Sequence, residues 1–506
     1  MKKYSIIIIA VALNFFFFFL LLEVNGLSLD KLFKITGDSI GYVESSESLI
    51  NNGVMVYQKT AENKKFISNF KADDPVNEGI LYAFRSPGFT FFYYPIRLIF
   101  SQNISLILFL FFQVLITGLA KYLLYKIVYN ITKNKLLSYI AFTFALITPY
   151  FSQFNNLLLT DSLGGAFFLF SVFFLLQWKS KQTVKSLIIS GLFFSLSFFL
   201  RPFLLLLLLP IWVFLFVESK FIFKKILINF ILFHSIFGVL EVLWVVRNYS
   251  LTDKFIPVAT TLEFQDTKHK SFHTLKTICL NKGVSMNWWD SRSPINWYIN
   301  TDNLNSDKVK QDFGSAEYQL ILESKTLFQQ SLNPSNSKLE RQNLENKSEE
   351  LLNKIVVKQK EAGFINYFII PRTKNTFNFI NQRSHKIFTA WKYPFNIVLQ
   401  GTLIFIFKTI VFLGTLFSLI NLFSASDIQN KLLASIPIVL LIFFGYLNNN
   451  VEDRYLFTSF PFLFLMTFIG FQNFKNKSIL YKSTVALSLI IVITLSITEL
   501  NQVIKW

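Results

Sequence analysis

Six short stretches of a largely apolar sequence carry carboxylates and arginines that could do chemistry together. A carboxylate can take a proton from an attacking group, and an arginine offers anions a bidentate fork that is always charged. The residues are the acids Asp38, Asp161 and Asp453 and the arginines Arg85, Arg201, Arg247 and Arg454. Because more than 400 residues separate the first from the last, only the fold could bring them to one site.

Most of these residues also have a simpler explanation. Asp38 stands in a Gly-Asp-Ser sequence, where an Asp is more often a helix cap or a turn former. Arg201, Arg247 and Arg454 lie near the ends of apolar runs, so each could be an interfacial anchor that extends to headgroups. Asp161 is the stronger candidate because it lies inside an apolar segment, where a carboxylate is costly and usually functional.

The composition indicates a membrane protein. The chain has 506 residues, 52% of them hydrophobic, and a mean hydropathy of +0.45, which is too apolar for a soluble protein. A net charge of +19 could indicate nucleic-acid binding, but basic residues of membrane proteins more often lie in cytoplasmic loops. The single cysteine, Cys279, excludes an intramolecular disulfide and a cysteine-rich metal site.

Eleven apolar runs approach the roughly 17–25 residues that a membrane-spanning helix needs. They predict an all-α polytopic membrane protein with about eleven transmembrane helices. The runs lie near residues 5–22, 104–125, 136–150, 157–177, 186–200, 202–217, 226–246, 398–422, 432–447, 455–471 and 483–498. The first run follows Lys2 and Lys3 and lacks a small-residue cleavage site, so we expect an uncleaved anchor.

The lysines of the short loops predict the orientation of the chain. If all eleven runs cross the membrane, loops with lysines alternate with loops that almost lack them, and the lysine-containing loops lie inside. Two long polar segments, residues 23–103 and 247–397, then lie outside, and the seven candidate residues share the outer boundary. We expect three domains: an N-terminal transmembrane module (1–246) that includes the first outer loop, a large extracytoplasmic loop or domain (247–397), and C-terminal transmembrane helices (398–506).

In their order along the chain, these stretches resemble the polyprenyl-phosphate-dependent glycosyltransferases of the GT-C type. That group includes the protein O-mannosyltransferases and the lipid A aminoarabinose transferase. The matching stretches are GDSIGY, RSPGFTFF, TDSLGG, GLFFSLSFFLRPF, VVRNYSLTDKFIPVAT and EDRYLFTSFPF. The resemblance covers nearly the whole chain, is thinnest in the large outer loop, and implies a GT-C fold whose N-terminal module is catalytic.

The sequence departs from the protein O-mannosyltransferases at two places. Ser39 follows Asp38 where those enzymes carry an Asp-Glu pair, and Arg85-Ser86-Pro87 stands where they carry His-Pro-Pro. Both differences argue against a protein O-mannosyltransferase proper. They leave room for a bacterial relative that modifies a glycan, a lipid or a protein.

The resemblance also implies a reaction and roles for the residues. The reaction is the transfer of a hexose or pentose, with inversion, from a polyprenyl-phosphate donor to a glycan, lipid or protein acceptor. It would occur on the extracytoplasmic face of the plasma (inner) membrane. Asp38 would be the base, Asp161 an acid that orients the acceptor or the first loop, and Arg85 the first candidate for the donor phosphate. The second phosphate candidate is Arg247, Arg201 and Arg454 would assist, and the supporting residues are Tyr42, Glu44, Asp453 and Tyr455.

The partners expected from this reaction are the lipid-linked donor, the acceptor and the bilayer, with no nucleic acid. The four histidines are scattered and the sequence has no metal-ligand spacing, so no cofactor is predicted, although a divalent metal is left open. A polymerase or ligase of surface polysaccharide would use the same outer arginines and is the main alternative. A secondary transporter is the other alternative, but its charges tend to lie near the midplane, often in repeated halves, and no duplication is visible here.

Overall fold

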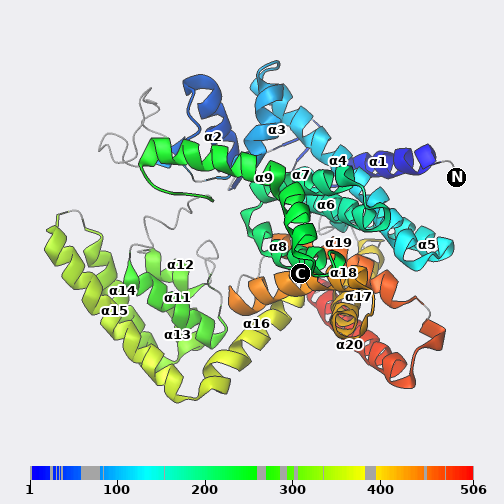
Figure 1. Cartoon of the computed structure of the whole chain (residues 1–506). Coiled ribbons are helices and arrows are strands. Elements are labelled where there is room, and N and C mark those ends of the chain that lie inside the picture. Colours follow the sequence, from blue (N-terminus) through cyan, green and yellow to red (C-terminus); the bar gives the residue numbers. More distant parts are fainter. Residues whose placement is uncertain are drawn as a thin grey trace. The chain divides into compact units, whose positions relative to one another are not determined.

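The structure is a computed structural model of the chain (Figure 1). It describes residues 3–22, 27–58, 80–258, 269–300, 306–448, 453–472 and 474–504, apart from residues 30, 34, 36, 37, 82, 84, 153, 285, 287–292, 334 and 382–394. The chain divides into two compact units. One comprises Met1–Thr261, Arg383–Val439 and Phe457–Trp506, and the other comprises Leu262–Gln382 and Leu440–Leu456. The three domains expected from the sequence stay a prediction.

The predicted all-α class is confirmed for the described residues, in which the only strands are one short antiparallel pair, β1 (Tyr57–Gln58) with β2 (Ile80–Leu81). Within the part of the chain that the structure describes, six helices are long and apolar enough to cross a membrane. These are α4 (Gln102–Thr132), α6 (Asp161–Lys181), α9 (Phe223–Thr252), α17 (Phe395–Ser424), α18 (Ile428–Leu441) with its continuation η7 (Ile442–Leu447), and α20 (Ile479–Ile504).

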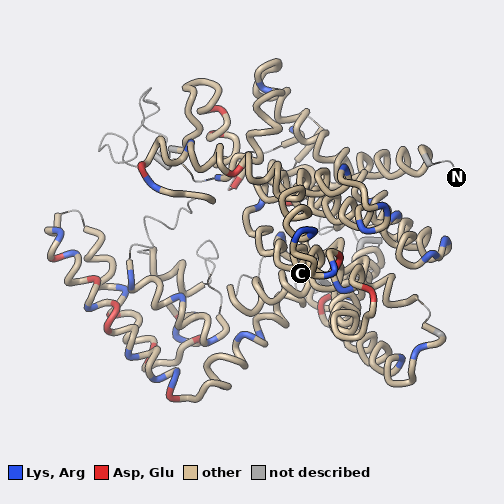
Figure 2. Tube along the Cα trace, in the orientation of Figure 1, with Lys and Arg blue, Asp and Glu red and all other residues tan. Residues whose placement is uncertain are grey.

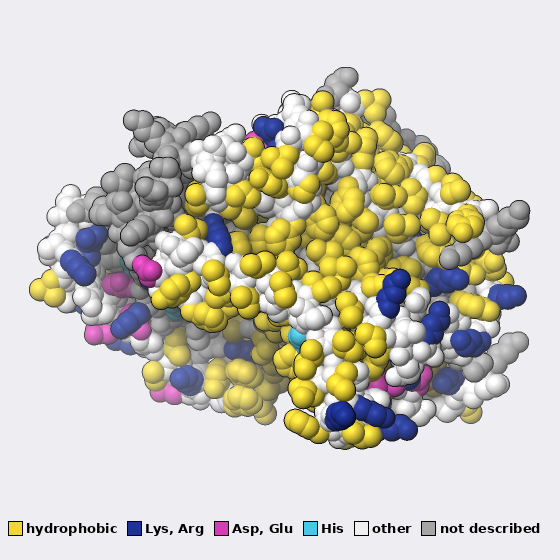
Figure 3. All heavy atoms as spheres, turned by 45° about the horizontal axis from the view of Figure 1, so that its top comes forward, with side chains coloured by type: hydrophobic (Ala, Val, Ile, Leu, Met, Phe, Trp, Pro, Cys, Tyr) yellow, Lys and Arg dark blue, Asp and Glu magenta, His cyan; other side chains and the backbone are white. Residues whose placement is uncertain are grey.

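The other five predicted runs are shorter apolar helices. They are α1 (Lys3–Leu20), α5 (Lys135–Ile147), α7 (Val184–Leu200), η4 (Pro202–Leu207) with α8 (Leu208–Glu218), and α19 (Asp453–Gly470). Figure 3 shows hydrophobic side chains spread over a broad part of one face, as expected of a surface in contact with lipid. The count of eleven spans stays a prediction.

The part of the first outer loop that the structure describes forms two helices that pack on each other, α2 (Asp38–Asn52) and α3 (Gly88–Arg97). Asp38 lies in the first turn of α2, where a negative charge interacts favourably with the helix dipole. Gly53, with φ of +72°, follows the last residue of α2, in the left-handed conformation that often ends a helix. The buried face of α2 is rich in serine, so its neighbours can approach closely.

An irregular segment, residues 148–160, links α5 to α6 and is largely buried. The 13 residues of α5 make a helix only about 20 Å long, whereas the hydrocarbon core of a bilayer is about 30 Å thick. The crossing predicted for residues 136–150 would therefore need part of this segment as well as α5. Irregular backbone within a membrane is tolerated where protein surrounds it, and most of this segment is buried.

A buried polar network fixes this irregular segment. The Nζ of Lys121, on α4, donates to Ser152 Oγ at 3.0 Å, and Ser152 Oγ donates to Asn14 Oδ1 of α1 at 2.5 Å. Asn155 Nδ2 donates to Thr117 Oγ1 of α4 at 2.8 Å. These five side chains are buried, so their hydrogen bonds satisfy groups that water cannot reach. The network ties two helices to the chain that leads to Asp161.

The second unit has a hydrophobic core of its own. Its helices are α11 (Lys270–Lys282), α12 (Pro294–Ile299), α13 (Ser306–Phe313), α14 (Ser315–Ser331), α15 (Lys338–Glu361), η5 (Ile365–Ile369) and α16 (Ile370–Ile380). The core includes Leu275, Trp297 and Phe328. Acidic and basic residues are interspersed along α15, unlike the spanning helices (Figure 2), which is typical of a helix in water.

Candidate active site

The first ion pair of the site joins the start of α2 to the segment that immediately precedes α3. Arg85 Nη2 donates to Asp38 Oδ1 at 2.6 Å, and both side chains are partly exposed. The Arg85 guanidinium also lies over the ring of Tyr42, 4.7 Å from its centre, one turn along α2 from Asp38. The structure therefore brings together three of the residues predicted from the sequence.

A second ion pair, Asp161 with Arg201, is buried. Asp161 occupies the first turn of α6, and Arg201 directly follows α7. A Cβ on Gly164 would come within 3.0 Å of Arg201 Cγ, so a larger residue there would crowd the arginine. Ser197 Oγ donates to the Gly164 carbonyl at 2.7 Å and holds the two helices in this register.

Glycine also lets the first outer loop reach the end of α7. A Cβ on Gly88 would lie only 2.3 Å from the Phe199 carbonyl oxygen, so the start of α3 packs backbone to backbone against α7. Gly88 follows Arg85 by three residues and Phe199 precedes Arg201 by two. This close approach explains how RSPG and LRPF, more than 100 residues apart, come to the same place.

Tyr42 connects the two ion pairs. Thr160, next to Asp161, donates its hydroxyl to the Tyr42 hydroxyl at 3.1 Å. Burial acts to raise the pKa of Tyr42, but the charges of Arg201 and Arg85 outweigh it, and the pKa lies below its ordinary value. Both arginines thus act electrostatically on one tyrosine, and Asp38, Arg85, Tyr42, Asp161 and Arg201 form a single charged cluster.

Arg247 lies at an apolar cavity of about 510 Å³ in the same unit. Its guanidinium donates to the Met55 carbonyl and to Asn248 Oδ1, and it stacks over Trp244 at 4.9 Å from the ring centre. The lining combines residues of α2, α3 and α9, and it includes Leu49, Met55, Pro87, Phe91, Leu240 and Trp244. Pro87 is two residues from Arg85, so this cavity lies close along the chain to the charged cluster.

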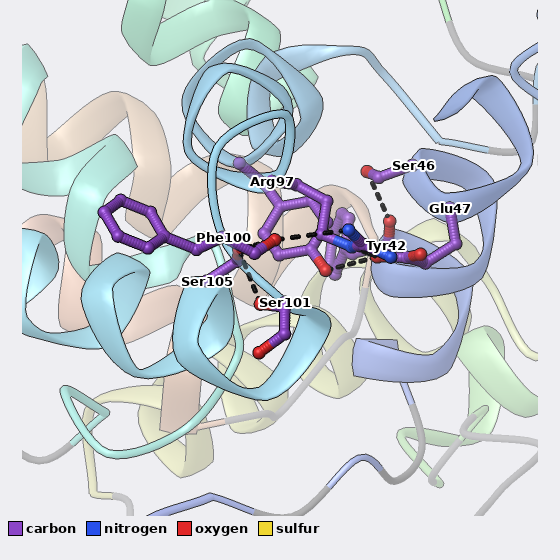
Figure 4. Close-up of polar contacts among 8 residues, drawn as sticks. Tyr42, Ser46, Glu47, Arg97, Phe100, Ser101 and Ser105 are labelled. Atoms are coloured by element: carbon purple, nitrogen blue, oxygen red, sulfur yellow. Dashed lines mark hydrogen bonds and ion pairs between the residues drawn. The ribbon is translucent and has the colours of Figure 1, made fainter. Parts of the chain in front are cut away.

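A second set of polar contacts holds α2 against α3 (Figure 4). Arg97 Nε donates to Glu47 Oε1 at 2.9 Å, and Tyr93 donates its hydroxyl to the same oxygen. Burial and the hydrogen bond to Glu47 raise the pKa of Tyr93, so it stays a donor. Ser46 and Thr90 add a hydroxyl pair at 2.8 Å. These contacts orient α2, whose first residue is Asp38.

The remaining predicted residues lie in different environments. Glu44 is exposed on α2. Arg454 and Tyr455 belong to the second unit, where Arg454 stacks over the Tyr455 ring at 5.3 Å and Tyr455 stacks on Phe444 at 4.3 Å. The side chain of Asp453 lies outside the described residues. A shared site for these residues and the charged cluster stays a prediction.

Two residues next to the charged cluster belong to no motif that could have been recognised in the sequence. Thr160 precedes Asp161 and looked like an ordinary polar residue, yet it makes the hydrogen bond to Tyr42. The second residue is Tyr57, on β1. Burial and the charge of Glu44 raise the pKa of Tyr57, while the charge of Arg85 acts in the opposite direction, so Tyr57 lies near the cluster. Only the strand that follows α2 brings Tyr57 there, and no motif marks it.

The other end of α6 carries a lysine that pairs with two acids. Lys179, in its last turn, pairs with Asp427 at 2.6 Å and with Glu218 at 3.2 Å, so the ends of α6, α8 and α17 converge there. Asp161 occupies the opposite end of α6. Among the residues that the structure describes, no group of three or more His, Cys, Asp or Glu side chains is arranged to hold a metal ion.

A model of a known family matches the part of the chain that contains several residues of this site. Residues 85–244 match the model of the family described as dolichyl-phosphate-mannose-protein mannosyltransferase. This match supports a GT-C type glycosyltransferase. It begins at Arg85, includes Asp161 and Arg201, covers about a third of the chain, and excludes Asp38. A search of curated proteins finds no match.

The family match and the apolar helices agree on the protein's setting. Residues 85–244 resemble a membrane glycosyltransferase family, which agrees over this part of the chain with the resemblance inferred from the ordered motifs, and the repeated apolar helices indicate a multi-pass membrane protein. The matched residues include two complete spanning helices, α4 and α6, most of α9, and both members of the buried ion pair. The charged cluster described above is therefore the natural candidate for the active site.

Proposed function

We propose that this protein transfers a sugar from a polyprenyl-phosphate donor to an acceptor at the extracytoplasmic face of the plasma (inner) membrane. One observation carries the proposal: Asp38 and Arg85 pair at 2.6 Å beside an apolar cavity. Pro87, two residues after Arg85, lines that cavity together with Arg247. Such a donor needs a cationic site for its phosphate next to an apolar surface for its prenyl chain. The family match to lipid-phosphate-dependent transferases supports the same donor class.

Asp38 is proposed as the general base. An acceptor hydroxyl is a weak nucleophile at neutral pH, and a positioned carboxylate that takes its proton contributes about 100- to 10,000-fold. Direct attack on the anomeric carbon would displace the phosphate in one step and invert the configuration. The partial exposure of Asp38 leaves room for an acceptor to approach.

Arg85 is proposed to bind the departing phosphate. Its guanidinium has five N–H donors, so it can hold Asp38 with one edge while the rest contacts phosphate oxygens. Negative charge grows on the phosphate as the glycosidic bond breaks, and a fixed cation stabilises that charge. Arg247 is the second cation for the same group, since it lies on the wall of the apolar cavity. Asp161 and Arg201 would orient the first outer loop through Thr160 and Tyr42.

The proposed face follows from the charges at the two ends of α6. Lys179 and the neighbouring lysine-containing loops lie at one end, and the positive-inside rule assigns such loops to the cytoplasm. Asp161 begins the other end, so the cluster would face the extracytoplasmic side.

The test uses purified protein in lipid nanodiscs. We expect wild-type protein to consume a polyprenyl-phosphate sugar and release polyprenyl phosphate when membrane extract from the producing cells supplies the acceptor. Cells that lack the protein should accumulate a lipid-linked sugar and lose one surface glycan. If no lipid-linked sugar accumulates and the purified protein consumes none of the donors offered, the proposal is wrong.

A further inference from the structure

The second unit exposes a cluster of large hydrophobic side chains on η5 and α16. Phe364, immediately before η5, and Ile365, Ile370 and Phe377 are between 45% and 65% exposed. Exposed apolar residues scattered singly are ordinary, but a contiguous group on one short segment marks a contact with a partner or a membrane. We call these four residues the apolar face of η5–α16.

The cluster is local to one part of the second unit. Among the described residues of that unit, the other exposed large hydrophobics are Ile442 and Leu447 on η7, Val357 near the end of α15, and Leu332 and Leu339. Leu332 and Leu339 flank the turn between α14 and α15. That turn is separated from η5 by the length of α15, about 35 Å for its 24 residues. Among its described residues, α15 therefore has no group of exposed hydrophobic side chains comparable to the one on η5 and α16.

The neighbour of α16 shows where this face lies relative to a membrane. Within the second unit α16 packs along η7, and a Cβ on Gly445 of η7 would come within 2.8 Å of Thr376 Cα. Phe379 also packs against Phe444, with ring centres 6.0 Å apart. η7 is the last turn of the candidate span Ile428–Leu447. The 20 residues of that span make about 30 Å of helix, the thickness of the hydrocarbon core, so η7 ends at a membrane boundary.

The charges around the apolar face fit that boundary. Lys374 is exposed on α16 between Ile370 and Phe377, and near the end of α15 Lys358 and Lys360 are exposed together with one acid, Glu361. Arg372 is buried under Phe368, with its guanidinium 3.7 Å from the ring centre, and it donates to the Phe368 carbonyl at 3.2 Å. Helical segments that lie in a membrane interface combine aromatic and aliphatic residues on one face with lysine or arginine at the rim.

We propose that η5–α16 is an interfacial segment whose apolar face inserts into the headgroup–acyl boundary of the leaflet at which η7 ends. The 11 residues of α16 are too few to cross a bilayer, but they suffice to lie in its surface. The polar second unit would then be held to the membrane by its own surface as well as by its chain connections. This inference does not depend on the reaction proposed above.

The test measures the surroundings of single labelled positions in the full-length protein in vesicles. Ile365→Cys and Phe377→Cys carry an environment-sensitive fluorophore on the apolar face, and Leu339→Cys carries it at an exposed apolar residue at the other end of α15. The parent protein is the background control because Cys279 is buried, and burial raises the pKa of its thiol, which slows labelling. Vesicles contain lipids brominated near the glycerol end of the acyl chain, and iodide is added as the aqueous quencher.

We expect brominated lipid to quench the labels at residues 365 and 377 several-fold more than the label at residue 339, with the reverse order for iodide. Equal access of iodide to all three labels would overturn the proposal. Protection of the two labels from both quenchers would overturn it as well, because the occupant would then be protein, either a second copy or another part of this chain. A Phe364→Ser/Ile370→Ser variant should expose the label at residue 365 to iodide without changing the label at residue 339.

Discussion

Two Asp–Arg pairs of the same site differ chiefly in their access to water. The side chains of Asp38 and Arg85 are 30% and 19% exposed, whereas those of Asp161 and Arg201 are 0% and 8% exposed. An exposed pair can open towards a substrate at little cost, but a buried pair leaves an uncompensated charge when it separates. The comparison teaches that one pair is available for chemistry and the other for holding the framework, although both combine the same residue types.

The largest expected effect comes from the buried pair. Asp161→Asn removes the carboxylate that Arg201 pairs with, and breaking a buried pair costs about 3–5 kcal/mol. We therefore expect a low yield of folded protein and a clear fall in its apparent melting temperature in detergent. Glu499→Gln is the matched control, because it breaks the buried pair between Lys408 of α17 and Glu499 of α20. It should lower stability comparably while transfer per folded molecule stays closer to wild type. An Asp161→Asn protein as stable as wild type would remove the distinction between the two Asp–Arg pairs.

The exposed pair should affect the reaction and leave stability alone. Asp38→Asn keeps the size and most hydrogen bonds of the side chain but removes the proton acceptor. We expect normal insertion and donor binding, with transfer slower by at least about 100-fold. Glu350→Gln, at an exposed acid on α15 that has no predicted role, should transfer sugar at the wild-type rate. Transfer by Asp38→Asn near the wild-type rate, at equal membrane abundance, would show that Asp38 is only a helix-terminal residue, since asparagine replaces aspartate well there.

Arg85 distinguishes a phosphate ligand from a partner of Asp38. A charge-assisted hydrogen bond contributes about 1.5–3 kcal/mol, so Arg85→Ala should lose roughly tenfold to more than a hundredfold in rate. Arg85→Lys should keep part of the activity because it keeps the charge. The matched control is Arg97→Ala, which breaks the pair between α3 and Glu47 of α2 but leaves the cation beside Asp38. If both alanine variants lose the same activity, Arg85 acts only by holding α2 to α3.

The smallest expected effect concerns the link between the pairs. Tyr42→Phe removes the hydroxyl that accepts from Thr160, and such a bond contributes about 0.5–1.5 kcal/mol. Transfer should fall by no more than about tenfold. Thr160→Val should have a similar effect, and the double variant should lose little more than either one alone, because both remove the same bond. Fully additive losses would show that the two hydroxyls do not act through each other.

Much of the fold was predictable because it rests on local properties. Length and hydrophobicity of a run are properties of neighbouring residues, and all eleven apolar runs are apolar helices in the structure. Asp161 lies within the predicted apolar run 157–177, and a carboxylate in such a run is unusual enough to indicate a functional residue from the sequence alone. The matched family model begins at Arg85, in a motif that the sequence alone had singled out.

The site was only partly predictable because its environment depends on contacts between distant residues. Nothing near Asp161 indicates that Arg201 covers it, and nothing near Asp38 indicates that it stays accessible. The exposed apolar residues of η5 and α16 belong to no apolar run long enough to have been predicted from the sequence.

By itself the sequence determined that this chain forms repeated apolar helices, that Asp161 and Lys179 lie at opposite ends of one of them, and which residue types could act. Only the tertiary structure decided which acid is buried, which arginine reaches the apolar cavity, and that Tyr42 joins the pairs. The reason is that hydrophobicity and charge are properties of each residue type, whereas the burial of a side chain depends on how distant parts of the chain pack together. At Gly88 the missing side chain lets the backbone of α7 approach closely, and at Gly164 it leaves room for Arg201 beside Asp161.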